Sequence, residues 1–143
     1  MVTRSAQGPV RLLGQVIVVY AVVAISTVAL LGILSATSPH LAPTDAWVHA
    51  IIVGVFAVVL PLRLRGVRSG KRGSLRAIGI ISGVLVAVNV AEASIPGFVP
   101  TWMRVEMVAI ALLLAISVVL VIRIATVGDN GAHGPITAER SRR

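Results

Sequence analysis

Cysteine is absent from the 143-residue chain, and this excludes disulfides, thiolate metal sites, cysteine nucleophiles and palmitoylation. Aromatic residues make up only 3% of the sequence, and the five acidic residues are outnumbered by thirteen basic ones. The chain also lacks the G-x-S-x-G, H-E-x-x-H, G-x-G-x-x-G and P-loop motifs. We therefore expect a protein without enzymatic activity, cofactor or metal.

Apolar sequence is what the chain has in excess: 57% of its residues are hydrophobic and its mean hydropathy is +0.97. A helix needs roughly 20 apolar residues to cross the hydrocarbon of a bilayer, where backbone polar groups find no other partner. Four runs meet or approach this length, and we predict spans at residues 12–34, 46–62, 75–95 and 102–122. Residues 1–127 are thus predicted to form an all-α integral membrane four-helix bundle, followed by a flexible cytoplasmic tail at 128–143.

The first apolar run follows Arg4 and Arg11, so it also has to be compared with a secretory signal peptide. Its apolar stretch is too long for the central region of a signal peptide. The residues before Ser38 make a poor cleavage site. We therefore expect an uncleaved membrane span.

Basic residues are concentrated beside alternate ends of the predicted spans, which sets their orientation. They lie in the N-terminal arm, between the second and third spans, and after the fourth span, while Arg104 is the exception. Basic segments stay on the cytoplasmic side, so both termini are predicted to be cytoplasmic. Trp47 and Trp102 then fall at the outer interface. Lys71 is the only lysine, and a composition rich in Arg, Ala, Val and Gly is typical of GC-rich bacterial genomes, so we predict a bacterial plasma membrane.

The basic segment between the second and third spans has two compatible interpretations. It holds the loop inside the cell, and it attracts anionic lipid headgroups by about 1 kcal/mol per basic residue near the surface. The net charge of +8 does not indicate nucleic-acid binding, because the charges lie between and after apolar runs rather than on a soluble module. The residues predicted to contact anionic lipid are Arg63, Arg65, Arg68, Lys71, Arg72 and Arg76.

The two predicted outer turns share a pattern. Residues 39–44 and 96–101 both read P-x-x-x-P-T, offset by 57 positions, and His49 aligns with Glu106 at the same offset. One interpretation is a duplicated helical hairpin; the other is that proline and threonine are common in such turns. In either case proline ends one helix and the threonine is expected to cap the next.

Small residues recur along two of the predicted helices and would let neighbouring helices approach closely. The second helix carries Ala46, Ala50, Gly54 and Ala57, and the third carries Gly79, Gly83, Ala87 and Ala91. A chain this rich in Ala and Gly also produces such stripes by chance. Polar residues lie on the opposite side of the third helix, so we expect that helix at the centre of the bundle. Pro61 predicts a modest kink in the second helix.

Polar and ionisable residues cluster in the outer half of the predicted bundle, where they are costly and often functional. Glu92 and Arg104 flank a short turn, each opposed by its own helix dipole, so we expect them to form an ion pair. Asp45 and His49 share one helix face, which favours a contact between them or, as an alternative, half of a metal site with Glu92 or Glu106. The candidate residues are Asp45, His49, Asn89, Glu92, Arg104 and Glu106.

Two functions remain open. The first is a non-enzymatic accessory or interaction subunit, because the small-residue stripes suit contacts with another membrane protein or a second copy of the chain. The second is a small oligomeric transporter or channel that uses the polar residues around Glu92, with a proton or cation relay through Glu92 and Asn89 as its chemistry.

Overall fold

The structure, a computed structural model, describes residues 4–97 and 99–130, and it confirms the predicted all-α fold. The elements are α1 (Arg4–Thr37), a short 3-10 helix (Pro39–Leu41), α2 (Thr44–Arg68), α3 (Arg72–Ser94) and α4 (Thr101–Asn130). Each of the four α-helices is long and apolar enough to cross a membrane. Valine, isoleucine and leucine side chains are exposed on all four of them, as a lipid-facing surface requires.

The helices extend past the predicted spans at most of their ends, because polar residues at a membrane interface still make helical hydrogen bonds. α2 runs through Pro61 without a break. α4 reaches Asn130, into the segment 128–143 that the sequence predicts to be a flexible tail. The rest of that segment, from residue 131 onward, lies outside the described residues.

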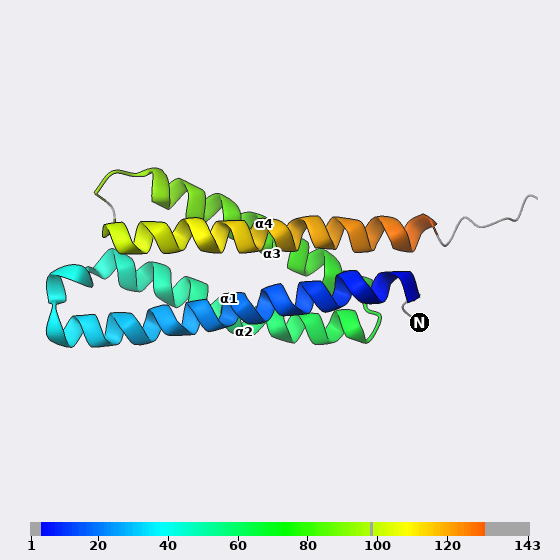
Figure 1. Cartoon of the computed structure of the whole chain (residues 1–143), viewed down its shortest axis with the longest axis horizontal. Coiled ribbons are helices and arrows are strands. Elements are labelled where there is room, and N and C mark those ends of the chain that lie inside the picture. The colour runs from blue at the N-terminus through cyan, green and yellow to red at the C-terminus, as the bar shows by residue number, and fades with distance from the viewer. Residues whose placement is uncertain (1–3, 98, 131–143) are drawn as a thin grey trace, which may run out of the picture.

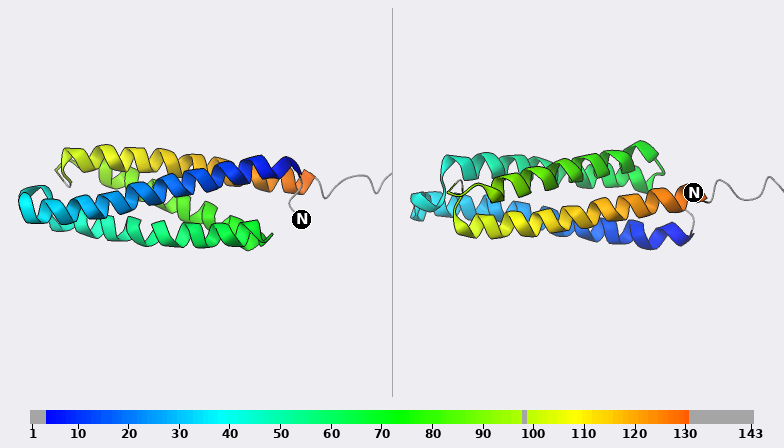
Figure 2. Two further views of the ribbon diagram at one scale, coloured as in Figure 1. Left: turned by 60° about the horizontal axis from the view of Figure 1, so that its bottom comes forward. Right: turned by 90° about the horizontal axis from the view of Figure 1, so that it is seen from above.

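The helices form an antiparallel bundle in which each helix contacts two neighbours (Figures 1 and 2). α1 packs against α2 and α4, and α3 packs most extensively against α4 and least against α2. The prediction that the third helix is central is therefore wrong: its polar face is turned inward, as expected, but no helix among the described residues is surrounded by the other three. Two hairpins, α1–α2 and α3–α4, lie side by side.

The buried side of three of the four helices follows a seven-residue repeat. Along three helices the inward positions are separated by alternating steps of three and four residues, the spacing of left-handed helix packing. The buried stripes are Leu13, Ile17, Tyr20, Ala24, Thr27 and Leu31 on α1, Ala46, Ala50, Val53, Ala57, Leu60, Leu64 and Val67 on α2, and Met103, Met107, Ile110, Leu114, Ser117, Val121 and Ile124 on α4. α3 departs from the pattern and buries Ser74, Ile78, Ser82, Leu85 and Asn89.

The two small-residue stripes have different surroundings. On α2 the stripe is used inside the bundle, where Ala46, Ala50 and Ala57 are buried. On α3 the first member, Gly79, has the side chain of Val121 in α4 against it: an added Cβ would lie 3.0 Å from Val121 Cγ1. The remaining members of the α3 stripe face outward.

The turn between α2 and α3 brings the two helices close together at Gly66. A Cβ built on Gly66 would lie 2.9 Å from Ser74 Cβ and would also overlap the Ser74 hydroxyl. Gly70, with φ of +81°, ends α2 in the left-handed conformation that glycine adopts without strain. The amide of Lys71 then donates to the carbonyl of Gly66.

The two outer turns differ in conformation despite their shared P-x-x-x-P-T pattern. Residues Pro39–Leu41 form the 3-10 helix, whereas the second turn uses Gly97 at φ of +76°. The prediction that Thr44 caps α2 is wrong, because the N-cap is Pro43 and no side chain caps the helix. Trp47 instead joins the ends of α1 and α2 by donating from Nε1 to Ser35 Oγ at 3.1 Å.

The start of α1, the α2–α3 turn and the end of α4 lie at the same end of the bundle (Figure 1). The basic residues of the α2–α3 segment are all exposed there. Trp47, Trp102 and the candidate polar residues lie toward the other end. The bundle is therefore strongly polarised, with a basic end and an end whose interior contains acidic groups.

Replacing Gly66 with alanine should destabilise the protein by about 1–3 kcal/mol, because the new methyl group overlaps Ser74 at a position where neither backbone can move freely. The matched control is Gly73→Ala in the first turn of α3, where nothing lies within 4 Å of an added Cβ. Unfolding midpoints in detergent would measure both variants. Equal stability of the two would contradict the close approach at Gly66.

Candidate functional site

Polar side chains from all four helices meet between the two hairpins, near the end opposite the basic residues. We call this set the interhelical cluster; it comprises Thr27 of α1, His49 of α2, Asn89 and Glu92 of α3, and Glu106 of α4. Toward the basic end, the cluster is followed by buried packing that includes Tyr20 and Ala24. Toward the opposite end, it is followed by Met103, Val99 and Leu31. Buried polar groups surrounded in this way must find partners among themselves.

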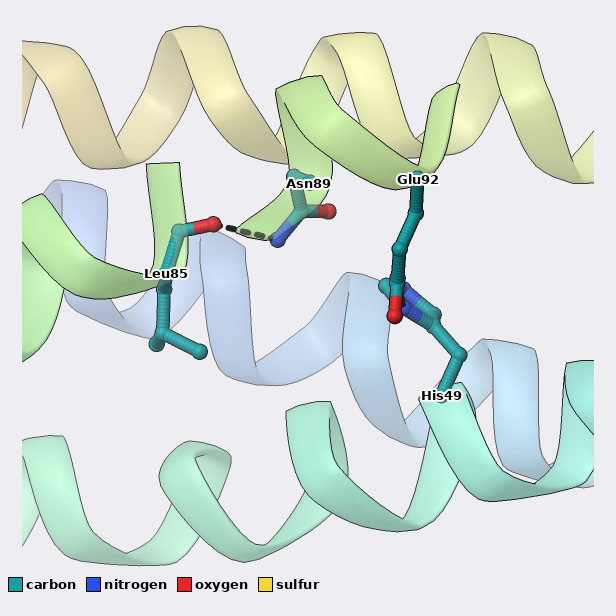
Figure 3. Close-up of polar contacts among 4 residues, drawn as sticks. All are labelled: His49, Leu85, Asn89 and Glu92. Carbon is teal, nitrogen blue, oxygen red and sulfur yellow. Dashed lines mark hydrogen bonds and ion pairs between the residues drawn. The ribbon is translucent and has the colours of Figure 1, made fainter. Parts of the chain in front are cut away.

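One contact in the cluster joins α2 to α3. Nδ1 of His49 lies 2.5 Å from Oε2 of Glu92, with the His49 side chain 4% exposed and that of Glu92 22% exposed (Figure 3). His49 directly precedes the inward stripe position Ala50, so its ring reaches sideways toward α3. The contact is an ion pair when the imidazole is protonated and a hydrogen bond when it is neutral.

A second contact joins α1 to α4. The hydroxyl of Thr27 is hydrogen-bonded to Oε1 of Glu106 and also lies 3.0 Å from the carbonyl oxygen of Val23, one turn earlier in its own helix. Both polar contacts therefore cross from one hairpin to the other.

Asn89 is fully buried but only half satisfied. Its Nδ2 donates to the carbonyl oxygen of Leu85 in the same helix at 2.8 Å, while its Oδ1 has no partner among the described residues. In Figure 3 this oxygen points away from Leu85, toward the side on which Glu92 lies. A buried acceptor without a donor costs about 1–3 kcal/mol and calls for an explanation.

The prediction of an ion pair between Glu92 and Arg104 is wrong. Glu92 contacts His49, and Nη2 of Arg104 donates to the carbonyl oxygen of Ile95 at 3.2 Å. Ile95 is the C-cap of α3, so Nη2 of Arg104 contacts the negative end of a helix dipole rather than a side chain, while Nε of Arg104 has no hydrogen-bond partner among the described residues. Glu92 follows Asn89 by three residues and faces inward with it, away from the turn.

The expected contact between Asp45 and His49 is replaced by the contact between His49 and Glu92. Asp45 is exposed in the first turn of α2. Among the residues that the structure describes, no three histidine, aspartate or glutamate side chains come close enough together to hold a metal ion. The alternative of a metal site built on Asp45 and His49 therefore receives no support from this geometry.

Sequence reasoning missed two residues that complete the polar interior. Thr27 and Tyr20 read only as interruptions of an apolar run, yet both lie on the buried stripe of α1. The hydroxyl of Tyr20 donates to the carbonyl oxygen of Val53 at 2.8 Å, joining α1 to α2. The signal that identifies them is their seven-residue separation, in phase with Leu13, Ile17 and Leu31.

The cluster can clamp helices together and can hold or exchange protons, because it combines an imidazole with two carboxylates. The carboxylate of Glu92 lies against Nδ1 of His49, which fixes the orientation of the imidazole ring. Comparisons with protein-family models, with curated proteins and with solved structures find no match to this chain. Its function therefore has to be argued from its own geometry.

Removing either partner of the His49–Glu92 contact should destabilise the bundle by about 1–3 kcal/mol, because the other partner is left buried without its hydrogen bond. We expect the effects of His49→Gln and Glu92→Gln to be non-additive in a double-mutant cycle, with a coupling energy above about 0.5 kcal/mol. Unfolding equilibria in mixed micelles provide the measurement. Strict additivity would show that the two side chains do not interact in the membrane.

Proposed function

We propose that this chain is a small multi-pass membrane protein that acts as a non-enzymatic accessory or interaction subunit. The observation that carries the proposal is the outward part of the α3 small-residue stripe. No atom of another helix lies within 4 Å of a Cβ built on Gly83, and Ala87 and Ala91 are exposed. The equivalent stripe on α2 is already used within the bundle.

An exposed stripe of small residues suits a second transmembrane helix better than it suits lipid. Association of helices in a bilayer depends on close packing and polar contacts, since lipid tails are as apolar as the helices themselves. The stripe begins at Gly79, where α4 approaches α3, and then turns away from α4 along the helix. A partner helix could therefore lie in the space beside α4, in contact with α3.

The interior supports a non-enzymatic role. Four side chains of the interhelical cluster contact one another in two pairs, Thr27 with Glu106 and His49 with Glu92, instead of lining an open site. A shallow, open groove of about 300 Å³ lies outside the bundle at the start of α4, where it is lined by Thr101, Arg104, Val105 and Val108. That lining contains no general base or nucleophile pair.

We further propose that the basic end of the bundle faces the cytoplasm of a bacterial cell, with both termini inside. The exposed basic residues of the α2–α3 segment are gathered at that end together with Arg11 and Arg123, which supports the positive-inside assignment. The same residues would contact anionic headgroups of the inner leaflet.

We also propose that the two hairpins are repeats of one duplicated helical hairpin. His49 and Glu106 are equivalent under the offset of 57 residues, and each contacts the opposite hairpin, His49 through Glu92 and Glu106 through Thr27. This exchange of contacts is what two repeated hairpins would produce. The different conformations of the two outer turns do not oppose it, because turns diverge more readily than packed helices.

Ala87→Leu and Ala91→Leu should weaken association with the partner roughly tenfold or more, because each adds bulk where a helix would approach. The matched control is Ala109→Leu, which enlarges an exposed alanine on α4. Tagged chains purified from native membranes in mild detergent, after crosslinking, would report a partner protein or a second copy. A wild-type chain that is monomeric and purifies alone would contradict the proposal.

A small oligomeric transporter or channel is the second candidate function. It is favoured by the position of Glu92, whose side chain is partly exposed while its partner His49 is buried, so the pair connects the interior to the bundle surface. Several copies would be needed, because four helices of this size enclose little volume.

Under this second candidate, Glu92→Gln and His49→Ala should each reduce ion or proton flux through proteoliposomes by at least an order of magnitude, since charge in the pathway would be lost. Asp45→Asn is the control, because Asp45 is exposed and outside the cluster. Flux that is unchanged in both cluster variants would eliminate this version.

A further inference from the structure

The hydroxyl of Thr27 has one proton and two oxygen neighbours. It lies within hydrogen-bond distance of the Val23 carbonyl oxygen and of Oε1 of Glu106. A carbonyl oxygen can only accept, and a hydroxyl can donate only once. If Thr27 donates to Val23, as threonines in helices commonly do, the contact with Glu106 needs a proton on the carboxyl group.

The charges of the cluster lead to the same conclusion independently. A protonated His49 paired with Glu92 is neutral, and this pair contains the only imidazole of the interhelical cluster. An ionised Glu106 would then leave one uncompensated negative charge between the helices. An isolated carboxylate in a medium of low dielectric constant is costly, and such groups bind a proton instead.

The unpartnered Oδ1 of Asn89 points to the same kind of ligand. It is a fully buried acceptor that needs a donor, and Figure 3 shows it pointing toward the side of α3 that carries Glu92. A water molecule or a carboxyl O–H would satisfy it. A cluster with two carboxylates, an amide oxygen without a partner and one imidazole has more hydrogen-bond acceptors than protons that can be donated to them.

We propose that the interhelical cluster is a binding site for one exchangeable proton, held as the carboxylic acid of Glu106 and donated to Oγ of Thr27. Uptake converts the Glu106 carboxylate into the acid. Release returns the proton to water at the nearby end of the bundle and leaves Thr27 to break its bond to Val23 and donate to the carboxylate. The site thus couples a proton to the contact between α1 and α4. This inference does not depend on the proposed accessory role.

The groups that face Glu106 are few. From α1 they are Thr27 and, seven residues earlier on the same stripe, Tyr20, whose hydroxyl donates to the carbonyl oxygen of Val53. From α2 and α3 they are His49 and its partner Glu92. On α4 itself, Arg104 lies two residues from Glu106, a spacing at which side chains do not face each other on a helix, and its Nη2 donates to the carbonyl oxygen of Ile95.

Infrared difference spectroscopy of the full chain in nanodiscs would test the site. At neutral pH the wild type should show the C=O stretching band of a protonated carboxylic acid, shifted in D₂O, because exposed carboxyl groups are ionised there. Glu106→Gln should remove the band. Asp45→Asn, which alters an exposed carboxyl group outside the cluster, should retain it. Thr27→Val should keep the band but move its frequency, since the hydrogen-bond acceptor is lost.

A wild-type spectrum without this band at neutral pH would overturn the proposal, whatever the behaviour of the variants. A band that survives Glu106→Gln would also overturn it, because the proton would reside elsewhere. If Glu106→Gln does not fold, the Thr27→Val spectrum decides, and an unshifted band in the folded variant contradicts the assignment. Helix content by circular dichroism establishes folding in each case.

Discussion

Contacts between polar side chains of opposite hairpins fix the arrangement of this bundle. His49 joins α2 to α3, and Thr27 joins α1 to α4, each through a glutamate. Apolar stripes alone would allow the hairpins to slide or rotate past one another, because one valine or leucine replaces another against lipid at little cost. Partners that must meet in hydrocarbon do not permit this freedom, so the polar pairs set the register in which the apolar residues then pack.

The number of helices and their up-and-down arrangement were predictable, because they follow from local features of the sequence. Four apolar runs and their length predict the helices, and the alternation of basic segments predicts that three chain segments lie at one end. The clustering of Asn89, Glu92, Glu106 and His49 at one level also follows from counting residues outward from the turns. Each of these conclusions needs only position along the chain, which helix geometry converts directly into height.

The contacts that each polar side chain makes were not predictable in the same way, because they depend on how each helix is rotated about its axis. Glu92 and Arg104 are close along the chain, yet the inward rotation of α3 directs Glu92 to His49, and the carbonyl of Ile95 competes successfully for Arg104. A backbone acceptor of this kind has no signature in the sequence. Thr27 was overlooked for a related reason: a hydroxyl in an apolar run gains meaning only when the seven-residue stripe shows that it faces inward.

The assignment of both polar contacts to the boundary between hairpins has a consequence for biogenesis. Each hairpin would enter a bilayer with its cluster residues unsatisfied: Thr27 and His49 on one, Glu92 and Glu106 on the other. An undocked hairpin is therefore distinguishable from an assembled one by charge exposed to lipid. Docking of the two hairpins therefore removes these groups from lipid and is the step that completes the fold.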